Sequence, residues 1–131
     1  MKDERIIRVG TDICSVKRVA ETYSRFGNRF LERILTSSEA KYALASAAHT
    51  HSRIAGRFAV KEATSKALGV GWRGLSFKEI EVVKDSSGKP GLKLHGRAAQ
   101  IAEEKNLLIW EISISHEHEF AVAFVLAHNG R

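Results

Sequence analysis

The stretch IWEISISHEHEFAVAFVL, residues 109–126, contains two apolar runs with only the tetrad HEHE (116–119) between them. The β-branched and aromatic residues in 109–115 and 120–126 are typical of strands. Two strands joined by so short a polar segment predict a β-hairpin whose tip is polar and titratable.

Working outward from this hairpin, the rest of the second half also has strand character. Residues 77–83 and 91–94 are strand-like runs joined across the turn-rich segment 85–90, and a short helix is expected over 96–106. Near the N-terminus, residues 6–10 predict a further strand, which Gly10 ends in a turn.

The remaining first half is helical in pattern. Apolar residues at three- and four-residue spacing predict an amphipathic helix over 16–34 with a break near Gly27, and Thr36 begins the capped first turn of a second helix. A third helix over 52–68 should stop at Gly69, because glycine suits a left-handed C-terminal cap. Helices followed by local strands predict an α+β fold, with helices packed on a mainly antiparallel sheet.

Composition indicates one ordinary domain over residues 1–131. The chain is 44% hydrophobic and 27% charged, has one proline, and contains no repeat or linker-like segment. A single cysteine cannot form an internal disulfide, and the longest apolar run is too short to cross a bilayer. Because the N-terminus also lacks a signal-peptide pattern, we expect a cytoplasmic protein that does not enter membranes.

Charge is distributed unevenly. Residues 1–73 carry 14 Lys and Arg against 7 Asp and Glu, whereas residues 74–131 carry 7 against 8. A basic half predicts an anionic partner: nucleic acid, an acidic protein, an anionic membrane or a phosphorylated metabolite. On a helical wheel, four arginines of the first helix form an arginine stripe, which is either a solvated face or a docking surface: Arg18, Arg25, Arg29 and Arg33.

The third helix carries the strongest chemical signal. Its stretch RFAVKEATSKALG (57–69) has apolar or small residues on nearly every side, so the helix should be largely buried. Glu62 and Lys66 are four residues apart and could form a surface ion pair. A carboxylate on so apolar a helix nevertheless needs a stronger partner, such as a metal ion or a polyphosphate with its cation.

Three further residues are candidates with two interpretations each. Asp12 can cap the following helix, or it can join Glu62 as a hard oxygen ligand for Mg²⁺, which usually takes one or two carboxylates. His116 is either merely exposed at the hairpin tip or a donor to a phosphate or nucleotide, and its surroundings lack zinc-ligand spacing. Gly69 is a helix cap whose backbone could also contact a ligand.

Short motifs along nearly the whole chain resemble those of the holo-[acyl-carrier-protein] synthases, the small 4′-phosphopantetheinyl transferases: VGTDI (9–13), KRV (17–19), RFAVKEA (57–63), KALG (66–69), GKP (88–90) and SISH (113–116). The resemblance implies the phosphopantetheinyl transferase fold. It also implies transfer of 4′-phosphopantetheine from coenzyme A to a serine of apo acyl carrier protein, with release of adenosine 3′,5′-bisphosphate. Family members are homotrimers with active sites between subunits.

The resemblance implies roles for individual residues. Asp12 and Glu62 match the family's Mg²⁺ carboxylates, and Lys66 matches a residue beside the diphosphate of coenzyme A. Arg57 and His116 match positions that approach the nucleotide and its 3′-phosphate. The arginine stripe matches the helix on which the family docks acyl carrier protein, an acidic helical bundle.

One position departs from a branch of the superfamily. The larger, single-chain transferases have a further carboxylate where this chain has Cys14, so we expect only two protein carboxylates on the metal. For the base that takes the serine proton, Glu62 acting through a bound water is the first candidate and Asp12 the second. Charge that builds on the phosphoryl oxygens would be stabilised by Mg²⁺ and Lys66.

A rival interpretation is a non-catalytic, basic nucleic-acid-binding domain, based on the arginine stripe and a sequence pI near 9.7. It leaves Asp12, Glu62 and Lys66 without a role, and the chain lacks the interleaved aromatic residues of a base-stacking surface. We therefore expect no nucleic-acid partner.

Overall fold

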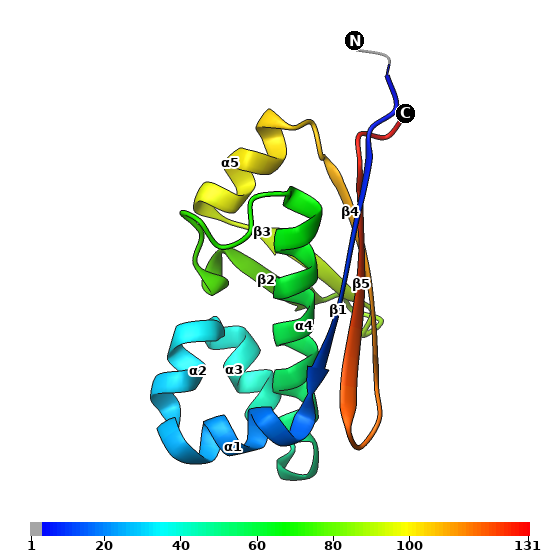
Figure 1. Cartoon of the computed structure of the whole chain (residues 1–131). Coiled ribbons are helices and arrows are strands. Elements are labelled where there is room, and N and C mark those ends of the chain that lie inside the picture. Colours follow the sequence, from blue (N-terminus) through cyan, green and yellow to red (C-terminus); the bar gives the residue numbers. More distant parts are fainter. Residues whose placement is uncertain (1–3) are drawn as a thin grey trace.

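The structure is a computed structural model that describes residues 4–131 and is coloured along the chain in Figure 1. Its strands are β1 (Ile7–Ser15), β2 (Ile80–Lys84), β3 (Pro90–Leu94), β4 (Ile109–His116) and β5 (Phe120–His128). Its helices are α1 (Val16–Phe26), α2 (Asn28–Ile34), α3 (Ser37–Leu44), α4 (Thr50–Leu68) and α5 (Gly96–Glu104), with short 3₁₀ turns η1 (Ala47–His49) and η2 (Phe77–Glu79).

The strands form two antiparallel sheets. In the larger sheet β5 lies between β1 and β4, and in the smaller sheet β2 pairs with β3. The predicted hairpin is confirmed, because β4 and β5 pair directly and His116 lies opposite Ala121 next to the tip. With helices packed on antiparallel strands, the α+β prediction is confirmed as well.

Helix α4 is the central element. It runs along one face of the larger sheet, with α1 to α3 beside its first half and the smaller sheet with α5 beside its second half (Figure 1). Thirteen of its 19 residues are buried, and it contributes to each of the three apolar clusters through Ile54, Val60 and Leu68. The prediction of a largely buried third helix is therefore confirmed, with its start two residues earlier than expected.

The two faces of the larger sheet differ. Along β5 the side chains alternate between buried alanine or valine, which face α4, and exposed residues such as Phe120, Val122 and Phe124. This is the period-two pattern of a strand with one covered face. The outer face of the sheet is consequently rich in exposed apolar side chains.

Two glycines end helices as expected. The chain breaks between α1 and α2 at Gly27, which has a φ of 58°, and α4 ends at Gly69 in the left-handed conformation with a φ of 78°. The Gly69 amide donates to the carbonyls of Ser65 and Lys66, which satisfies groups left over at the helix end.

Two strand predictions need correction. Gly10 does not end the first strand, which continues to Ser15, so Asp12 lies within β1 opposite Ala123. The helix cap is provided by Ser15, whose hydroxyl accepts from the Arg18 amide at 3.2 Å, and the capping interpretation of Asp12 is wrong. In addition, residues 77–79 form η2 instead of the start of a strand.

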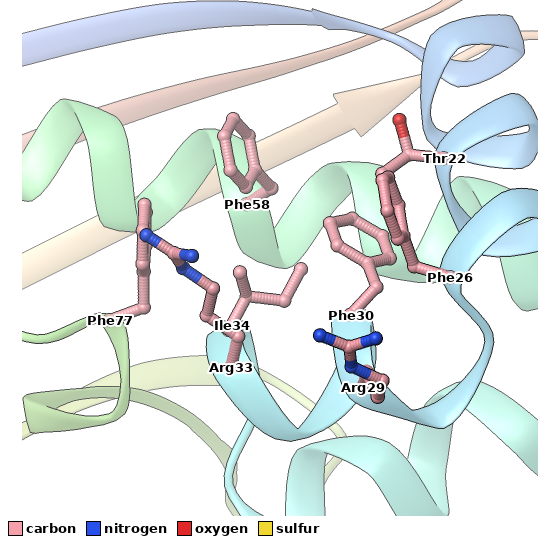
Figure 2. Close-up of a pocket in the computed structure, with 8 residues that line it drawn as sticks. All are labelled: Thr22, Phe26, Arg29, Phe30, Arg33, Ile34, Phe58 and Phe77. Atoms are coloured by element: carbon pink, nitrogen blue, oxygen red, sulfur yellow. The ribbon is translucent and has the colours of Figure 1, made fainter.

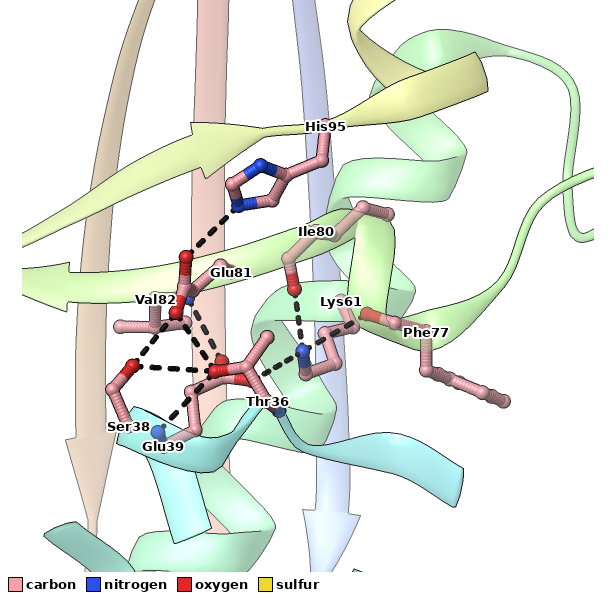
Figure 3. A network of polar contacts seen from close by, with 9 residues as sticks. All are labelled: Thr36, Ser38, Glu39, Lys61, Phe77, Ile80, Glu81, Val82 and His95. Atoms are coloured by element: carbon pink, nitrogen blue, oxygen red, sulfur yellow. Dashed lines mark hydrogen bonds and ion pairs between the residues drawn. The ribbon is translucent and has the colours of Figure 1, made fainter. Parts of the chain in front are cut away.

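A buried polar network joins α3, α4 and β2 (Figure 3). The ammonium of Lys61 lies 2.8 Å from Glu39 Oε1 and also donates to the carbonyls of Phe77 and Ile80. Glu39 in turn accepts from the Val82 amide and closes the capping box with Thr36. Both charged side chains are fully buried, so this network replaces the water that each of them lost.

Within residues 4–131, no helix combines the length and the apolar character that crossing a membrane requires.

Candidate active site

The candidate site forms where β1 crosses α4. A Cβ atom on Gly10 would lie 1.8 Å from the Ala63 carbonyl oxygen, so only glycine permits the strand and the helix to approach this closely. Alternate residues of β1 point to the same face, and Asp12 and Cys14 therefore follow Gly10 toward α4. This crossing brings Asp12, early in the chain, into contact with Lys66 of α4.

Lys66 is bound to β1. Its ammonium lies 3.1 Å from Asp12 Oδ1 and 2.9 Å from the Thr11 carbonyl oxygen. The Lys66 side chain remains 55% exposed and that of Asp12 20% exposed, so the pair faces solvent. The alternative in which Lys66 pairs with Glu62 along the helix surface is wrong, because the crossing strand supplies a different carboxylate.

Glu62 has another partner. Its Oε2 accepts a hydrogen bond of 3.2 Å from the indole nitrogen of Trp72, which lies in the loop after α4. The carboxylate is half-buried and has no cation of its own among the interactions of residues 4–131. The desolvation argument from the sequence therefore still applies to Glu62.

The Cys14 thiol lies close enough to Asp12 and Glu62 for both carboxylates to influence its pKa. Burial, together with the negative charges of Asp12 and Glu62, raises the pKa of the Cys14 thiol to about 11 against the opposing effect of Arg18. A thiol with this pKa is neutral at physiological pH. Lys66 balances the charge of Asp12, so the Glu62 carboxylate is the uncompensated negative charge beside this thiol.

The donor set fits Mg²⁺. Asp12 and Glu62 offer hard oxygen ligands, and Mg²⁺ usually takes one or two carboxylates while water and phosphate complete its octahedron. No group of three or more His, Cys, Asp or Glu side chains gathers into a metal site anywhere in 4–131.

An apolar groove lies beside this site, between α2 and α4 (Figure 2). Phe30, Phe58 and Phe77 line it together with the side chains of Arg29 and Arg33, and its volume is about 410 Å³. Arg18 borders a neighbouring hollow that shares Phe30 and Phe58. An apolar floor with guanidinium groups around it is suited to an amphipathic, acidic partner.

The arginine stripe is altered by the helix break. The chain turns at Gly27, so Arg29 and Arg33 belong to α2 and do not share a helical wheel with Arg18 and Arg25. Arg18, Arg29 and Arg33 still border the groove and its neighbouring hollow. Arg25 instead lies over the ring of Phe26 at 5.1 Å.

Arg57 lies on another face of α4. Only 6% of it is exposed, and its guanidinium carbon is 4.1 Å from the ring centroid of Tyr42, which Arg53 and Lys84 also approach. Burial lowers the pKa of Arg57, and Tyr42 and Glu39 counteract this effect. A single copy of the chain does not bring Arg57 to the Asp12 and Glu62 carboxylates.

His116 ends β4 and is exposed. It borders one hollow with Ile13 and Phe120, and a second with His49, His51 and His118. The sequence interpretation did not single out His49 and His51, since neither stands at a motif spacing to His116. Trp72, Phe58 and Phe77 were missed for the same reason, because their contacts link segments without a common local pattern.

Comparison with known proteins gives a consistent result. Residues 8–125 match the family model of the 4′-phosphopantetheinyl transferase superfamily. A holo-[acyl-carrier-protein] synthase of Gloeobacter violaceus is 47% identical over 118 residues, which cover 90% of this chain and 89% of the relative. One from Halothermothrix orenii is 40% identical over 93% of this chain and 97% of the relative.

Solved structures agree with the sequence relatives. The enzyme from Neisseria meningitidis is similar with a TM-score of 0.82 and 38% identity, covering 92% of this chain and 96% of that chain. The Helicobacter pylori enzyme in complex with coenzyme A gives a TM-score of 0.79 and 38% identity, covering 91% of this chain and 98% of that chain. These structures have the same fold as the present chain.

Proposed function

Because the chain belongs to the 4′-phosphopantetheinyl transferase superfamily, we propose that it performs the holo-[acyl-carrier-protein] synthase reaction at the crossing of β1 and α4. The enzyme transfers 4′-phosphopantetheine from coenzyme A to a serine of apo acyl carrier protein and releases adenosine 3′,5′-bisphosphate. The observation that supports this location most is the approach at Gly10, which brings the strand that carries Asp12 against the helix that carries Glu62 and Lys66.

Asp12 and Glu62 are proposed to hold Mg²⁺. The metal would neutralise negative charge on the diphosphate of coenzyme A during transfer. The two carboxylates come from a strand and a helix in contact, so their separation is fixed by backbone packing. Cys14 is not part of this proposal, because sulfur is a soft ligand that is poorly matched to a hard cation.

Lys66 is proposed to stabilise the developing charge on the phosphoryl oxygens. Its long side chain is mostly exposed and balances Asp12 in this structure. A cation at Asp12 would release the ammonium, which could then donate to the bound diphosphate. A positioned cation of this kind typically contributes about 10²–10³-fold to kcat.

Glu62 is the first candidate for the base that receives the serine proton, through one water molecule, and Asp12 is the second. Trp72 occupies Oε2 of Glu62, which leaves Oε1 as the oxygen that would face the water or the metal. Asp12 is less suited to this task in the present structure because the Lys66 ammonium occupies its Oδ1.

The groove between α2 and α4 is proposed to dock acyl carrier protein. Its three phenylalanines offer an apolar surface, and Arg18, Arg29 and Arg33 border it with positive charge. An acidic helical partner would match both properties. The combined variant Arg29→Glu/Arg33→Glu should raise the KM for apo carrier protein by about tenfold or more, with little change in the KM for coenzyme A.

Arg97→Glu is a matched control for this charge reversal, since Arg97 is exposed on α5, away from the groove. The control should leave both KM values unchanged. If the groove variant changes both KM values equally, the arginines belong to the nucleotide site instead.

His116, Arg57 and Gly69 are the remaining ligand-binding candidates. His116 is exposed and can reach a nucleotide, so the proposal that it contacts the 3′-phosphate is compatible with its place at the end of β4. Binding of the nucleotide by Arg57 stays a prediction. It would require the Arg57 guanidinium to leave the ring of Tyr42. Gly69 is exposed at the end of α4. Its amide caps the helix, so its backbone could contact a ligand only in an arrangement that keeps these cap hydrogen bonds.

A homotrimer is proposed because one face of the larger sheet is uncovered. The apolar side chains on or beside that face are between 39% and 60% exposed, and they include Ile13, Phe120, Val122 and Phe124. Contiguous apolar patches of this kind usually mark protein interfaces. His116 borders a hollow with Ile13 and Phe120, so an active site between subunits would follow from burial of this face.

Sedimentation equilibrium tests the assembly. A mass three times that of the chain is expected, and Val122→Asp should shift it toward the monomer. A wild-type monomer at assay concentration would contradict the trimer.

A cytoplasmic location remains a separate prediction, which rests on the single cysteine.

Mass spectrometry of the carrier protein tests the reaction itself. Apo acyl carrier protein is incubated with coenzyme A, Mg²⁺ and the enzyme, and its mass should increase by one phosphopantetheine group. The Asp12→Ala and Glu62→Ala variants should lower the rate by orders of magnitude while their thermal midpoints stay near that of the wild type. An unmodified carrier would instead favour the nucleic-acid-binding alternative.

A further inference from the structure

Trp72 makes a contact with the candidate site that its apolar character does not require. It lies in the loop between α4 and η2, and its indole Nε1 is 3.2 Å from Glu62 Oε2. An indole N–H is only a donor and carries no charge. Trp72 therefore occupies one oxygen of Glu62 without reducing the negative charge that a cation would need.

The indole is held in place from its other side. The ring centroids of Trp72 and Phe77 are 4.1 Å apart, and Phe77 stacks on Phe58 with centroids 5.6 Å apart. Phe58 belongs to α4, four residues before Glu62. The contacts thus form a closed ring that begins and ends on the same helix, and Trp72 cannot turn away from Glu62 without losing its contact with Phe77.

Lys66 offers a contrast. It binds Asp12 through a flexible side chain that is 55% exposed, so its ammonium can move when a ligand arrives. Trp72 is half-buried against the ring of Phe77, and this contact restricts its movement. Of the two groups that donate to the site's carboxylates, one is mobile and charged and the other is fixed and neutral.

We propose that Trp72 is a positioning residue that fixes the orientation of the Glu62 carboxylate and thereby sets the cation affinity of the site. The inference rests on the proposed role of Glu62 as a Mg²⁺ ligand. Groups that hydrogen-bond to a metal ligand orient it, and their loss typically weakens metal binding by about 10- to 100-fold.

Trp72→Phe removes the donor and keeps an aromatic ring against Phe77. Trp110→Phe is the matched control, since Trp110 is the only other tryptophan in the sequence and its indole donates to the Leu107 carbonyl at 2.9 Å. Each variant loses one indole hydrogen bond, but only Trp72→Phe loses it at a carboxylate. Their thermal midpoints are expected to be similar.

Isothermal titration of Mn²⁺ into protein saturated with coenzyme A is the primary measurement. Trp72→Phe should bind Mn²⁺ about tenfold more weakly than the wild type, and Trp110→Phe should bind it equally well. The KM for apo carrier protein should be the same in all three. An unchanged Mn²⁺ affinity in Trp72→Phe overturns the proposal while the metal site stands, whereas a wild type that binds no Mn²⁺ overturns both.

Fluorescence supplies a readout that does not depend on replacing Trp72. In the Trp110→Phe protein Trp72 is the only tryptophan, so its emission reports on the contact with Glu62. Titration with Mg²⁺ and coenzyme A should shift this emission, and Glu62→Gln in the same background should abolish the shift. A shift that survives Glu62→Gln would show that Trp72 senses something other than the Glu62 carboxylate and would overturn the proposal.

Discussion

Helix α4 carries two lysines that each pair with a carboxylate, and the two pairs differ in nearly every physical respect. Lys61 and Glu39 lie 2.8 Å apart with no exposure of either side chain, whereas Lys66 and Asp12 lie 3.1 Å apart at the surface. The Lys61 ammonium also donates to two backbone carbonyls and cannot move, while Lys66 is free to exchange its partner. The buried pair stabilises the fold, and the exposed pair is available for chemistry.

The effects on the pKa of Lys61 agree with a structural role for the buried Lys61–Glu39 pair. Burial lowers the pKa of Lys61, and the charge and hydrogen bond of Glu39 oppose that effect. Removing both charges from water is costly, and the pair persists because each of its partners is in place. Loss of one member should therefore disturb the structure more than loss of either member of the exposed pair.

Breaking the buried pair is expected to have the largest effect on stability. Lys61→Met leaves Glu39 buried without a cation, and the Phe77 and Ile80 carbonyls lose their donor. We expect a loss of about 3–5 kcal/mol in the free energy of unfolding, measured by urea denaturation. The double variant Glu39→Gln/Lys61→Met should recover part of this loss, because it leaves no unpaired charge. A single-variant loss below about 1 kcal/mol would contradict the assignment.

Separating β1 from α4 should damage the exposed pair and the fold together. In Gly10→Ala the new methyl group would meet the Ala63 carbonyl, so the strand must shift. We expect a loss of about 1–3 kcal/mol in unfolding free energy and a fall in kcat, since Asp12 moves with the strand. Gly91→Ala is the control, because its Cβ would make only ordinary contacts of 3.9 Å or more. Wild-type activity in Gly10→Ala would show that catalysis does not depend on the close approach of β1 and α4 at Gly10.

A smaller, pH-dependent effect is expected at Glu81, which adjoins the buried pair in Figure 3. Burial raises the pKa of Glu81, but hydrogen bonds from Ser38, His95 and Thr36 outweigh it and hold the pKa at about 2, below its ordinary 4.5. Because the folded-state pKa is lowered, this contribution to stability is complete above pH 4.5 and is lost as the pH falls toward 2.

Glu81→Gln should accordingly cost about 1–2 kcal/mol at pH 7, and the difference from the wild type should shrink as the pH is lowered from about 4.5 toward 2. Urea denaturation over a pH series measures this difference in unfolding free energy. Glu111→Gln is the control, since Glu111 forms an exposed ion pair with Lys89 at 3.6 Å. A Glu81→Gln deficit that is constant with pH would indicate a packing defect instead of a charge effect.

The comparison also shows what local pattern can predict. The hairpin over 109–126, the Gly69 cap and the capping box at Thr36 each depend on residues within a few positions of one another, and the structure has all three. A glycine after an apolar run predicts the end of a strand, and the local sequence does not reveal that α4 crosses β1 at Gly10. The same limit applies to the pairing of Lys61 with Glu39, 22 residues away in the sequence.

The site was predicted only in outline. Residue type suggests Asp12 and Glu62 as a pair of hard oxygen ligands, no spacing rule links two residues so far apart in the sequence, and the family resemblance implies the same pair. Trp72 carries no local signal, because its role depends on Glu62 lying ten residues earlier on a helix that ends in between. Tertiary contacts of this kind are decided by packing, which a single sequence does not display.

Lys66 is proposed to act in the chemistry, whereas Lys61 holds α4 to α3 and β2 within the fold. The most direct test measures kcat at saturating coenzyme A and apo carrier protein, together with the thermal midpoint, for Lys66→Met. We predict a fall in kcat of about 10²-fold or more with almost no change in the thermal midpoint, because the side chain is exposed and its loss leaves no buried charge. A Lys66→Met enzyme with wild-type kcat would contradict the account, since the exposed pair would then be only a surface ion pair.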